Sequence, residues 1–151
     1  MLTVSQPAPD FSSPNQTGDI LSLKDFTGKT LILYFYPKDD TPGCTLEAND
    51  FTALASEFAA ANAVVLGVSK DDCTSHQAFI DKFGLAVDLL SDTSGEVCEA
   101  YGVWQMKEKN GMSKMGIVRS TFIIDAKGIL TSVEYGVKPE GHAQAVLSKI
   151  A

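Results

Sequence analysis

Apolar residues follow two different periodicities along this chain. Two uninterrupted apolar runs, at 30–36 and 63–69, predict strands that are buried on both faces of a sheet. Apolar residues at intervals of three and four instead predict helices, over 45–61, over 73–83 and around Ala143, Val146, Leu147 and Ile150. The buried strand at 30–36 is therefore the element that precedes the helix over 45–61.

Shorter signals complete the order of elements. They predict an N-terminal β-hairpin within 10–23, a strand at 87–90, a short helix around Val97, Cys98 and Tyr101, and strands at 117–124 and 129–135 joined by a turn at 125–128. The resulting order, β–α–β–α–β–α–β–β–α, predicts an α/β fold with a mixed central sheet flanked by helices. This combination is typical of a thioredoxin-like architecture, which we expect to form one domain over residues 1–151.

Composition excludes several classes of partner. The 151 residues carry 12 basic and 19 acidic side chains, a net charge of −7 without a basic cluster, so neither nucleic acid nor an anionic membrane is an expected partner. No apolar run reaches the roughly 20 residues that cross a bilayer. Residues 1–7 lack the basic and apolar regions of a secretory signal. We therefore expect a cytoplasmic protein.

The cysteines and histidines do not form a structural framework. The three cysteines, Cys44, Cys73 and Cys98, are odd in number and include no C-x-x-C pair, and the two histidines, His76 and His142, stand far apart in sequence. This pattern fits neither a disulfide-stapled scaffold nor a zinc site. We expect no metal and no cofactor, and we interpret the thiols as either core residues or reactive groups.

Cys44 occupies the most informative position. It lies where the strand at 30–36 gives way to a helix, with Pro42 suited to the first helical position and Thr41 to the N-cap. Unpaired N–H groups and the positive end of the helix dipole favour a thiolate there. Arg119 opens a later apolar strand, where an isolated charge would be costly, so we expect it to be the cation that pairs with Cys44.

The motif around this cysteine is specific. Pro37, Thr41 and Cys44 form the pattern Pro-x-x-x-Thr-x-x-Cys, which resembles the active-site signature of the peroxiredoxins. The block from Tyr34 to Glu47 is similar to the peroxiredoxin Q branch, also called bacterioferritin comigratory protein. Further matches follow in order over most of the chain, at 67–69, 75–76, 89–92, 101–104 and 119–125.

The resemblance implies a thiol-dependent peroxidase that reduces hydrogen peroxide and organic hydroperoxides. Cys44 would attack the O–O bond as a thiolate and become a sulfenic acid. Thr41, the N–H groups of the helix start and Arg119 would stabilise the leaving oxygen. Pro37 would shape the pocket, and Glu47 matches a glutamate that orients Arg119.

The chain departs from this family in its second cysteine. The two positions where relatives carry a resolving cysteine are Asn49 and Ile80 here. We therefore predict a one-cysteine cycle, in which thioredoxin, glutaredoxin or a small thiol reduces Cys44, in a monomer or weak homodimer. An atypical two-cysteine cycle through Cys73 stays open. So does a non-enzymatic redox sensor or holdase, whereas a disulfide oxidoreductase is disfavoured because C-x-x-C is absent.

The remaining polar and thiol groups are interpreted as structural. We expect Cys98 to pack in the core and His76 to be a hydrogen-bonded residue on an apolar helix stripe. His142 is expected at the surface. Asp39 and Asp40 are expected to lie in a solvated loop rather than to bind a metal.

Overall fold

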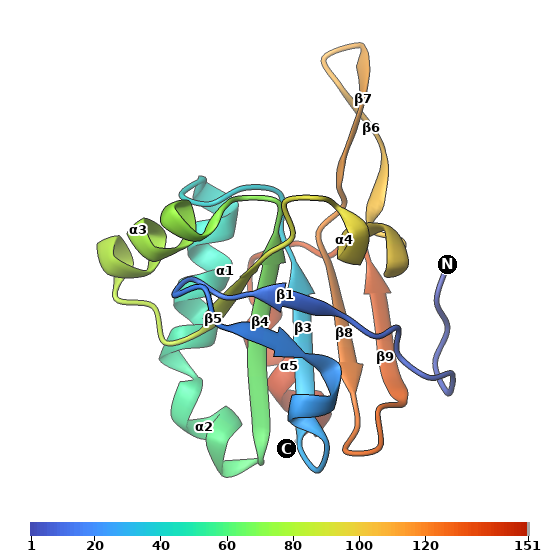
Figure 1. The fold of residues 1–151 in the computed structure, drawn as a ribbon. Helices are drawn as coiled ribbons and strands as arrows, with labels where there is room; N and C mark the ends of the chain where they lie inside the picture. Colours follow the sequence, from blue (N-terminus) through green and yellow to red (C-terminus); the bar gives the residue numbers. More distant parts are fainter. Residues whose placement is uncertain (151) are drawn as a thin grey trace.

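A five-stranded mixed sheet forms the centre of the computed structural model, which describes residues 1–150 (Figure 1). The elements follow in the order β1 (Ser12–Pro14), β2 (Ile20–Ser22), the 3₁₀ helix η1 (Leu23–Phe26), β3 (Thr30–Phe35), α1 (Pro42–Ala53), α2 (Ala55–Ala60), β4 (Ala63–Ser69), α3 (Cys73–Phe83), β5 (Asp88–Ser91), α4 (Glu96–Ala100), β6 (Trp104–Lys109), β7 (Met112–Ile117), β8 (Ser120–Ile124), β9 (Leu130–Tyr135) and α5 (His142–Ile150). The expected α/β class and N-terminal hairpin are confirmed.

The strand order of the central sheet is β5-β4-β3-β8-β9. The central strand β3 runs parallel to β4 and antiparallel to β8, so the sheet is mixed, as its sequence predicts. A central strand of this kind has neighbours on both edges and layers on both faces, which explains why the β3 run is apolar throughout. The loop that leaves β3 opens at the carboxyl end of the sheet, where β4 also ends.

Side chains of β3 alternate between two separate cores. Ile32, Tyr34 and Tyr36 lie in the core covered by α1, α2, α3 and α5. Leu31, Leu33 and Phe35 lie in the other core, which contains residues of α4 and of the N-terminal segment. The sheet therefore separates the groups on its two faces, and Figure 1 shows the hairpin β1–β2 crossing the second face.

Two boundaries differ from those that the sequence predicts. The helix expected over 45–61, with Pro42 at its first position, does start at Pro42, but it is divided at Leu54, whose ψ of 11° leaves the helical range. The strand expected over 117–124 is also two elements, because the chain leaves β7 after Ile117 and enters the central sheet only at Ser120. An apolar run alone cannot reveal such a change of sheet.

The hairpin β6–β7 is absent from the sequence-based expectation. Its strands are polar and exposed, so they show no apolar alternation. The signal that could have found it is the pair Asn110-Gly111, whose φ angles of 54° and 77° are those of a type I′ turn. Figure 1 shows this hairpin projecting beyond the body of the domain, at the end of the sheet where β3 finishes.

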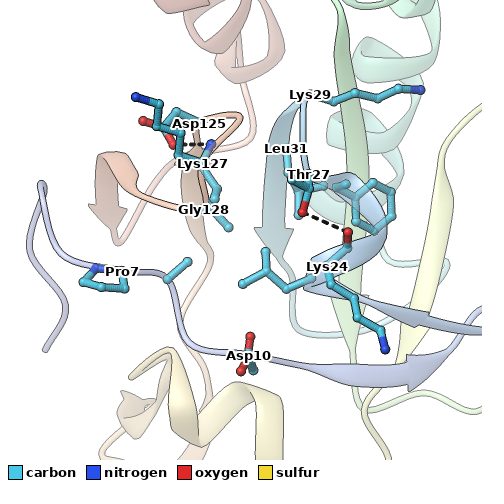
Figure 2. Close-up of a pocket in the computed structure, with 13 residues that line it drawn as sticks. Pro7, Asp10, Lys24, Thr27, Lys29, Leu31, Asp125, Lys127 and Gly128 are labelled. Atoms are coloured by element: carbon cyan, nitrogen blue, oxygen red, sulfur yellow. Dashed lines mark hydrogen bonds between the residues drawn. The ribbon is translucent and has the colours of Figure 1, made fainter.

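A hollow of about 290 Å³ opens at the opposite end of β3. It lies between η1, the N-terminal segment and the β8–β9 turn, with Lys24, Lys29 and Lys127 around it (Figure 2). Within residues 1–150, no helix combines the length and apolarity that crossing a membrane requires.

Gly67 provides a test of the packing between β3 and β5. It is paired with Tyr34 on one side and Leu89 on the other. A Cβ at this position would lie 2.7 Å from Leu89 Cδ2 and 2.9 Å from Tyr34 Cζ. Gly67→Ala should therefore lower the free energy of unfolding by about 1–3 kcal/mol, measured by urea denaturation. The exposed Thr74→Ala should stay within about 0.5 kcal/mol of the parent, and equal midpoints for both variants would contradict this packing.

Candidate active site

The loop after β3 places Cys44 in the first turn of α1. Pro42 is the first helical residue and Thr41 is the N-cap, with φ −103° and ψ 155°, as predicted. The Cys44 side chain is buried, at 2% exposure. The N–H groups of Gly43 and Cys44 belong to a turn that has no acceptors within its own helix, and no backbone acceptor outside the helix meets them within residues 1–150. The thiol therefore lies beside donors that favour a negative sulfur.

Arg119, the only arginine of the chain, contacts this thiol. Its Nη2 donates to Cys44 Sγ over 3.3 Å. Strand register explains how residues so distant in sequence meet: β8 pairs with β3 through Ser120 and Phe35. Arg119 precedes β8, and so it lies beyond the last residue of β3, at the edge from which the Cys44 loop departs.

Glu47 holds Arg119 in place. Its Oε1 accepts a hydrogen bond of 2.6 Å from Arg119 Nη1. The Glu47 side chain is fully buried and that of Arg119 is 14% exposed, so the pair is shielded from solvent and salt. The two guanidinium nitrogens thus divide their contacts, one to the carboxylate and one to the sulfur of Cys44.

Gly43 makes room for the guanidinium. A Cβ on Gly43 would lie 3.1 Å from Arg119 Nη2 and 3.4 Å from Pro139 Cγ. Pro139, in the link between β9 and α5, therefore packs against the start of α1 beside the site. Sequence reasoning did not identify Pro139, because nothing local indicates that the β9–α5 link returns to α1.

Burial and charge act in opposite directions on this pair. Burial raises the pKa of Glu47 from 4.5 to about 7, although Arg119 works to lower it. Burial also works to lower the pKa of Arg119, but the charges of Glu47 and Cys44 outweigh it and the pKa is raised. The second Glu47 oxygen, Oε2, is buried and has no hydrogen-bond partner. The guanidinium is thus firmly cationic, whereas burial moves Glu47 toward its protonated form and Arg119 opposes this only in part.

Thr41 and Pro37 lie on the same loop but have different surroundings. The Thr41 hydroxyl donates to the Lys38 carbonyl oxygen over 2.8 Å and does not cap the helix. A hydroxyl oxygen also has acceptor lone pairs, so Thr41 keeps the capacity to accept a hydrogen bond. Pro37 is exposed and lines a groove that it shares with the β6–β7 hairpin.

Asp39 corrects the expectation of a solvated loop. It is 6% exposed, and its carboxylate accepts hydrogen bonds from Tyr36 Oη at 2.6 Å and Ser75 Oγ at 2.8 Å. His76 Nδ1 lies 2.7 Å from the same carboxylate, and the Asp39 N–H donates to Asp71 Oδ2. These bonds join the Cys44 loop to the start of α3, a long-range pairing that the sequence does not reveal.

Three groups of this network have the composition of a metal site. Ligand atoms of Asp39, Asp71 and His76 lie within 4.8 Å of one another. The Asp71 carboxylate already accepts from Ser69 Oγ, and His76 Nε2 contacts the Leu90 carbonyl oxygen at 2.9 Å. The protein thus supplies partners for these groups itself. His76 is confirmed as a buried, hydrogen-bonded residue.

His142 corrects a second expectation. It was predicted at the surface but is 7% exposed, with Nε2 2.7 Å from Thr121 Oγ1 and its ring edge-on to Phe51. Burial lowers the pKa of His142. The residue begins α5, and the packing of that helix against α1 encloses the histidine.

The other two cysteines lie away from Cys44. Cys98 is in the core on the opposite face of the sheet, as expected of a packing residue. Burial, followed by a hydrogen bond with Asp92, raises the pKa of Cys98 far above its ordinary value. Cys73 begins α3 and lines a hollow with Gln16, Thr17 and other residues, none of them from 37–44.

Comparison with known proteins identifies the family to which this chain belongs. The model of the AhpC/TSA family matches residues 4–133. This chain is a peroxiredoxin of the AhpC/TSA family. A Helicobacter pylori relative is 51% identical over 149 residues, covering 99% of this chain and 98% of its own length. Peroxiredoxin Bcp of Bacillus subtilis is 41% identical, covering 99% and 95%.

Solved structures place this peroxiredoxin in the Q branch. Peroxiredoxin Q of Xanthomonas campestris superposes with a TM-score of 0.91 at 40% identity, covering 97% of this chain and 96% of its own. PrxQ of Xylella fastidiosa gives 0.93 at 35% identity, covering 99% and 95%. The fold is therefore the thioredoxin fold and the protein is a thiol peroxidase. This result supports the peroxidase prediction over the non-enzymatic alternative.

The buried carboxyl of Glu47 predicts a specific dependence of stability on pH. Its pKa rises from 4.5 in the unfolded chain to about 7 in the fold, so the fold binds more protons between these values. The contribution to stability is fully present below pH 4.5 and is lost as the pH rises to about 7. Relative to Glu47→Gln, the peroxiredoxin should lose on the order of 3 kcal/mol over that range.

Urea denaturation at several pH values measures this difference. The matched control is Glu57→Gln, at an exposed acid of α2. Parallel stability curves for the parent and Glu47→Gln would show that Glu47 does not titrate in this range.

Proposed function

We propose that Cys44 is the peroxidatic cysteine and that Arg119, Thr41 and Pro37 form its catalytic surroundings. The observation that carries this proposal is the 3.3 Å contact between Arg119 Nη2 and Cys44 Sγ at the start of α1. A guanidinium and the helix dipole both favour the thiolate, the form that attacks peroxides. The same cation then faces the oxygen that acquires negative charge.

The proposed step is a displacement at oxygen. The Cys44 thiolate attacks one peroxide oxygen, an S–O bond forms, and the O–O bond breaks. The leaving oxygen takes a proton and departs as water or an alcohol, while the cysteine becomes a sulfenic acid. Arg119 and the free N–H groups of the α1 start stabilise the leaving oxygen, and Thr41 accepts a hydrogen bond from the peroxide.

We further propose that hydrogen peroxide and organic hydroperoxides are both substrates. The solved bacterioferritin comigratory protein of Xanthomonas campestris, 39% identical to this chain, is described as having alkyl peroxide reduction activity. The groove between Pro37 and the β6–β7 hairpin is mostly lined by apolar groups, which suits an alkyl substituent.

The return to the thiol is proposed to use an external reductant. Asn49 and Ile80 stand where relatives would carry a resolving cysteine. Cys98 is separated from Cys44 by the sheet, and Cys73 opens into a different hollow. Thioredoxin, glutaredoxin or a small thiol would reduce Cys44, and the expected location is the cytoplasm. The two-cysteine alternative requires Cys73 and Cys44 to approach to within about 7 Å between Cα atoms.

The role of Arg119 has a direct kinetic test. Arg119→Ala should slow sulfenic acid formation about 10²–10³-fold, because it removes a donor that acts on the developing charge. The rate for Arg119→Lys should lie between those of the parent and Arg119→Ala. An ammonium keeps the charge but cannot divide its donors between Glu47 and Cys44. Stopped-flow measurement of peroxide consumption checks this, with Lys138→Ala as a control. An unchanged rate in Arg119→Ala removes Arg119 from the mechanism.

The one-cysteine cycle has a chemical test. After one equivalent of peroxide, a sulfenic acid trap should label Cys44 in the parent, and Cys44→Ser should remove both the label and the rapid peroxide consumption. Intact mass and non-reducing peptide mapping identify the products. Cys73→Ser should behave as the parent. A Cys44–Cys73 disulfide in the parent would instead establish the two-cysteine cycle.

A further inference from the structure

The β6–β7 hairpin, residues 104–117, forms an arm that borders the groove proposed for the alkyl substituent, but the peroxide step makes no use of its lysines. Its two strands pair only with each other among the described elements. Figure 1 shows it standing away from the domain, at the end of the sheet where the Cys44 loop lies. A two-stranded ribbon in water is only marginally stable by itself, and beyond Trp104 and Ile117 at its base the arm does not pack in the described cores.

The arm reverses the charge of the protein. It carries Lys107, Lys109 and Lys114 against a single acid, Glu108, a net charge of +2. The whole chain has −7, so the remaining residues together carry −9. Positive charge is therefore concentrated on the one element that projects from an otherwise acidic protein.

The placement of these lysines is costly for the hairpin itself. Lys107 and Lys114 lie directly opposite each other in the register, and like charges at such positions are destabilising. Strand alternation places Lys109 on the same face, where no acid accompanies them. The lone Glu108 is on the other face, opposite Ser113. An anionic partner would turn this repulsion into a favourable interaction.

Apolar groups accompany the cations. Met106 is 61% exposed and Met112 is 74% exposed, although methionine usually fills gaps in cores and adaptable interfaces. At the base of the arm lies a groove of about 620 Å³, with Trp104, Met115 and Ile117 among its lining residues. Lysines, among them Lys70, Lys109 and Lys114, line the same groove. Exposed methionine and aromatic groups beside charged ones are a composition found at protein interfaces.

The groove reaches the active site. Pro37, on the loop that leads to Cys44, lines it together with the arm. Lys107 lies across Gly116 and donates to the Ile117 carbonyl oxygen over 2.9 Å. Its pKa is lowered, first by burial and then by the charge of Arg119, which places it within electrostatic range of the site. A partner seated in the groove would therefore contact the loop that leads to Cys44.

We propose that this arm and its groove dock an acidic protein dithiol that reduces the Cys44 sulfenic acid. The inference rests on the one-cysteine cycle. One partner thiol displaces water from the sulfenic acid and forms a mixed disulfide with Cys44. The second partner thiol then attacks its neighbour's sulfur, releasing Cys44 as a thiol and leaving the partner as an internal disulfide.

A compact protein fits this surface better than an extended polyanion. A bilayer or a nucleic acid would also face the acidic remainder of the chain, whereas a small protein can contact the arm and the active site alone. At the tip of the arm Lys109, Asn110 and Gly111 are polar, and the single Met112 opposite Lys109 offers little apolar area for insertion among lipid chains. Electrostatic attraction by the arm would raise the rate of encounter with an acidic partner.

Charge reversal tests the docking surface. Lys109→Glu with Lys114→Glu alters the arm, and Lys24→Glu with Lys127→Glu applies the same change of charge around the hollow at the opposite end of β3 (Figure 2). Each protein is oxidised with one equivalent of peroxide, and the sulfenic acid is verified. Each oxidised protein is then mixed with a pre-reduced acidic thioredoxin-class protein or with dithiothreitol, and the rate of Cys44 reduction is measured.

The ratio of the protein-driven rate to the dithiothreitol-driven rate is the readout. It should fall on the order of tenfold in the arm variant and stay at the parent value in the control. In about 1 M salt, where the Debye length is about 3 Å, the parent should approach the arm variant.

Other outcomes overturn the proposal. The proposal is wrong if the ratio is unchanged in the arm variant. It is also wrong if dithiothreitol reduces the oxidised parent but the acidic protein dithiol does not. In both cases the peroxidase function stands. Binding to phosphatidylglycerol vesicles that depends on Lys109 and Lys114, without an effect on the ratio, would assign the arm to membranes instead. Failure of the proposed function is distinct, because no sulfenic acid would form before the reductant is added.

Discussion

The contact on which the site depends is the buried ion pair between Glu47 and Arg119. A guanidinium alone near the thiol could adopt many rotamers, and a buried carboxylate alone would be costly. Together they fix one nitrogen on Glu47 and direct the other to Cys44 Sγ. Gly43 leaves the space that this geometry requires. The pairing of β3 with β8 brings the two residues together. It places Arg119, just before β8, at the edge of the sheet from which the chain leaves β3 toward α1 and Glu47.

Short sequence patterns predicted those features that depend on neighbouring residues. The apolar run of β3 and the proline before Cys44 place the thiol at a helix start, and an arginine in an apolar segment indicates a partner. Tertiary structure decided the rest. Asp39 and His142 are polar side chains in turn-rich segments, and only contacts with α3 and β8 bury them. The β6–β7 hairpin lacks apolar alternation because only its base, at Trp104 and Ile117, packs on the core.

The three thiols occupy different environments, and the sheet keeps Cys98 apart from the other two. Cys44 lies in one core beside a cation, and Cys98 lies in the other, where burial and Asp92 oppose its ionisation. Cys73 belongs to the helix tied to the active-site loop through Asp39 and Ser75. Reactivity in this chain is therefore assigned by surroundings rather than by the number of cysteines, and a strand buried on both faces is what separates the two cores.

The position of Trp104 also has a practical consequence. It is the only tryptophan of the chain, it stands at the base of the arm in the groove shared with Pro37, and the ammonium of Lys70 lies 4.2 Å from the centre of its ring. Its emission therefore originates from one place, next to the catalytic loop and in the field of a cation. The molecule therefore carries a single intrinsic optical reporter in the groove that Pro37 also lines, and events in that groove can be monitored without an attached dye.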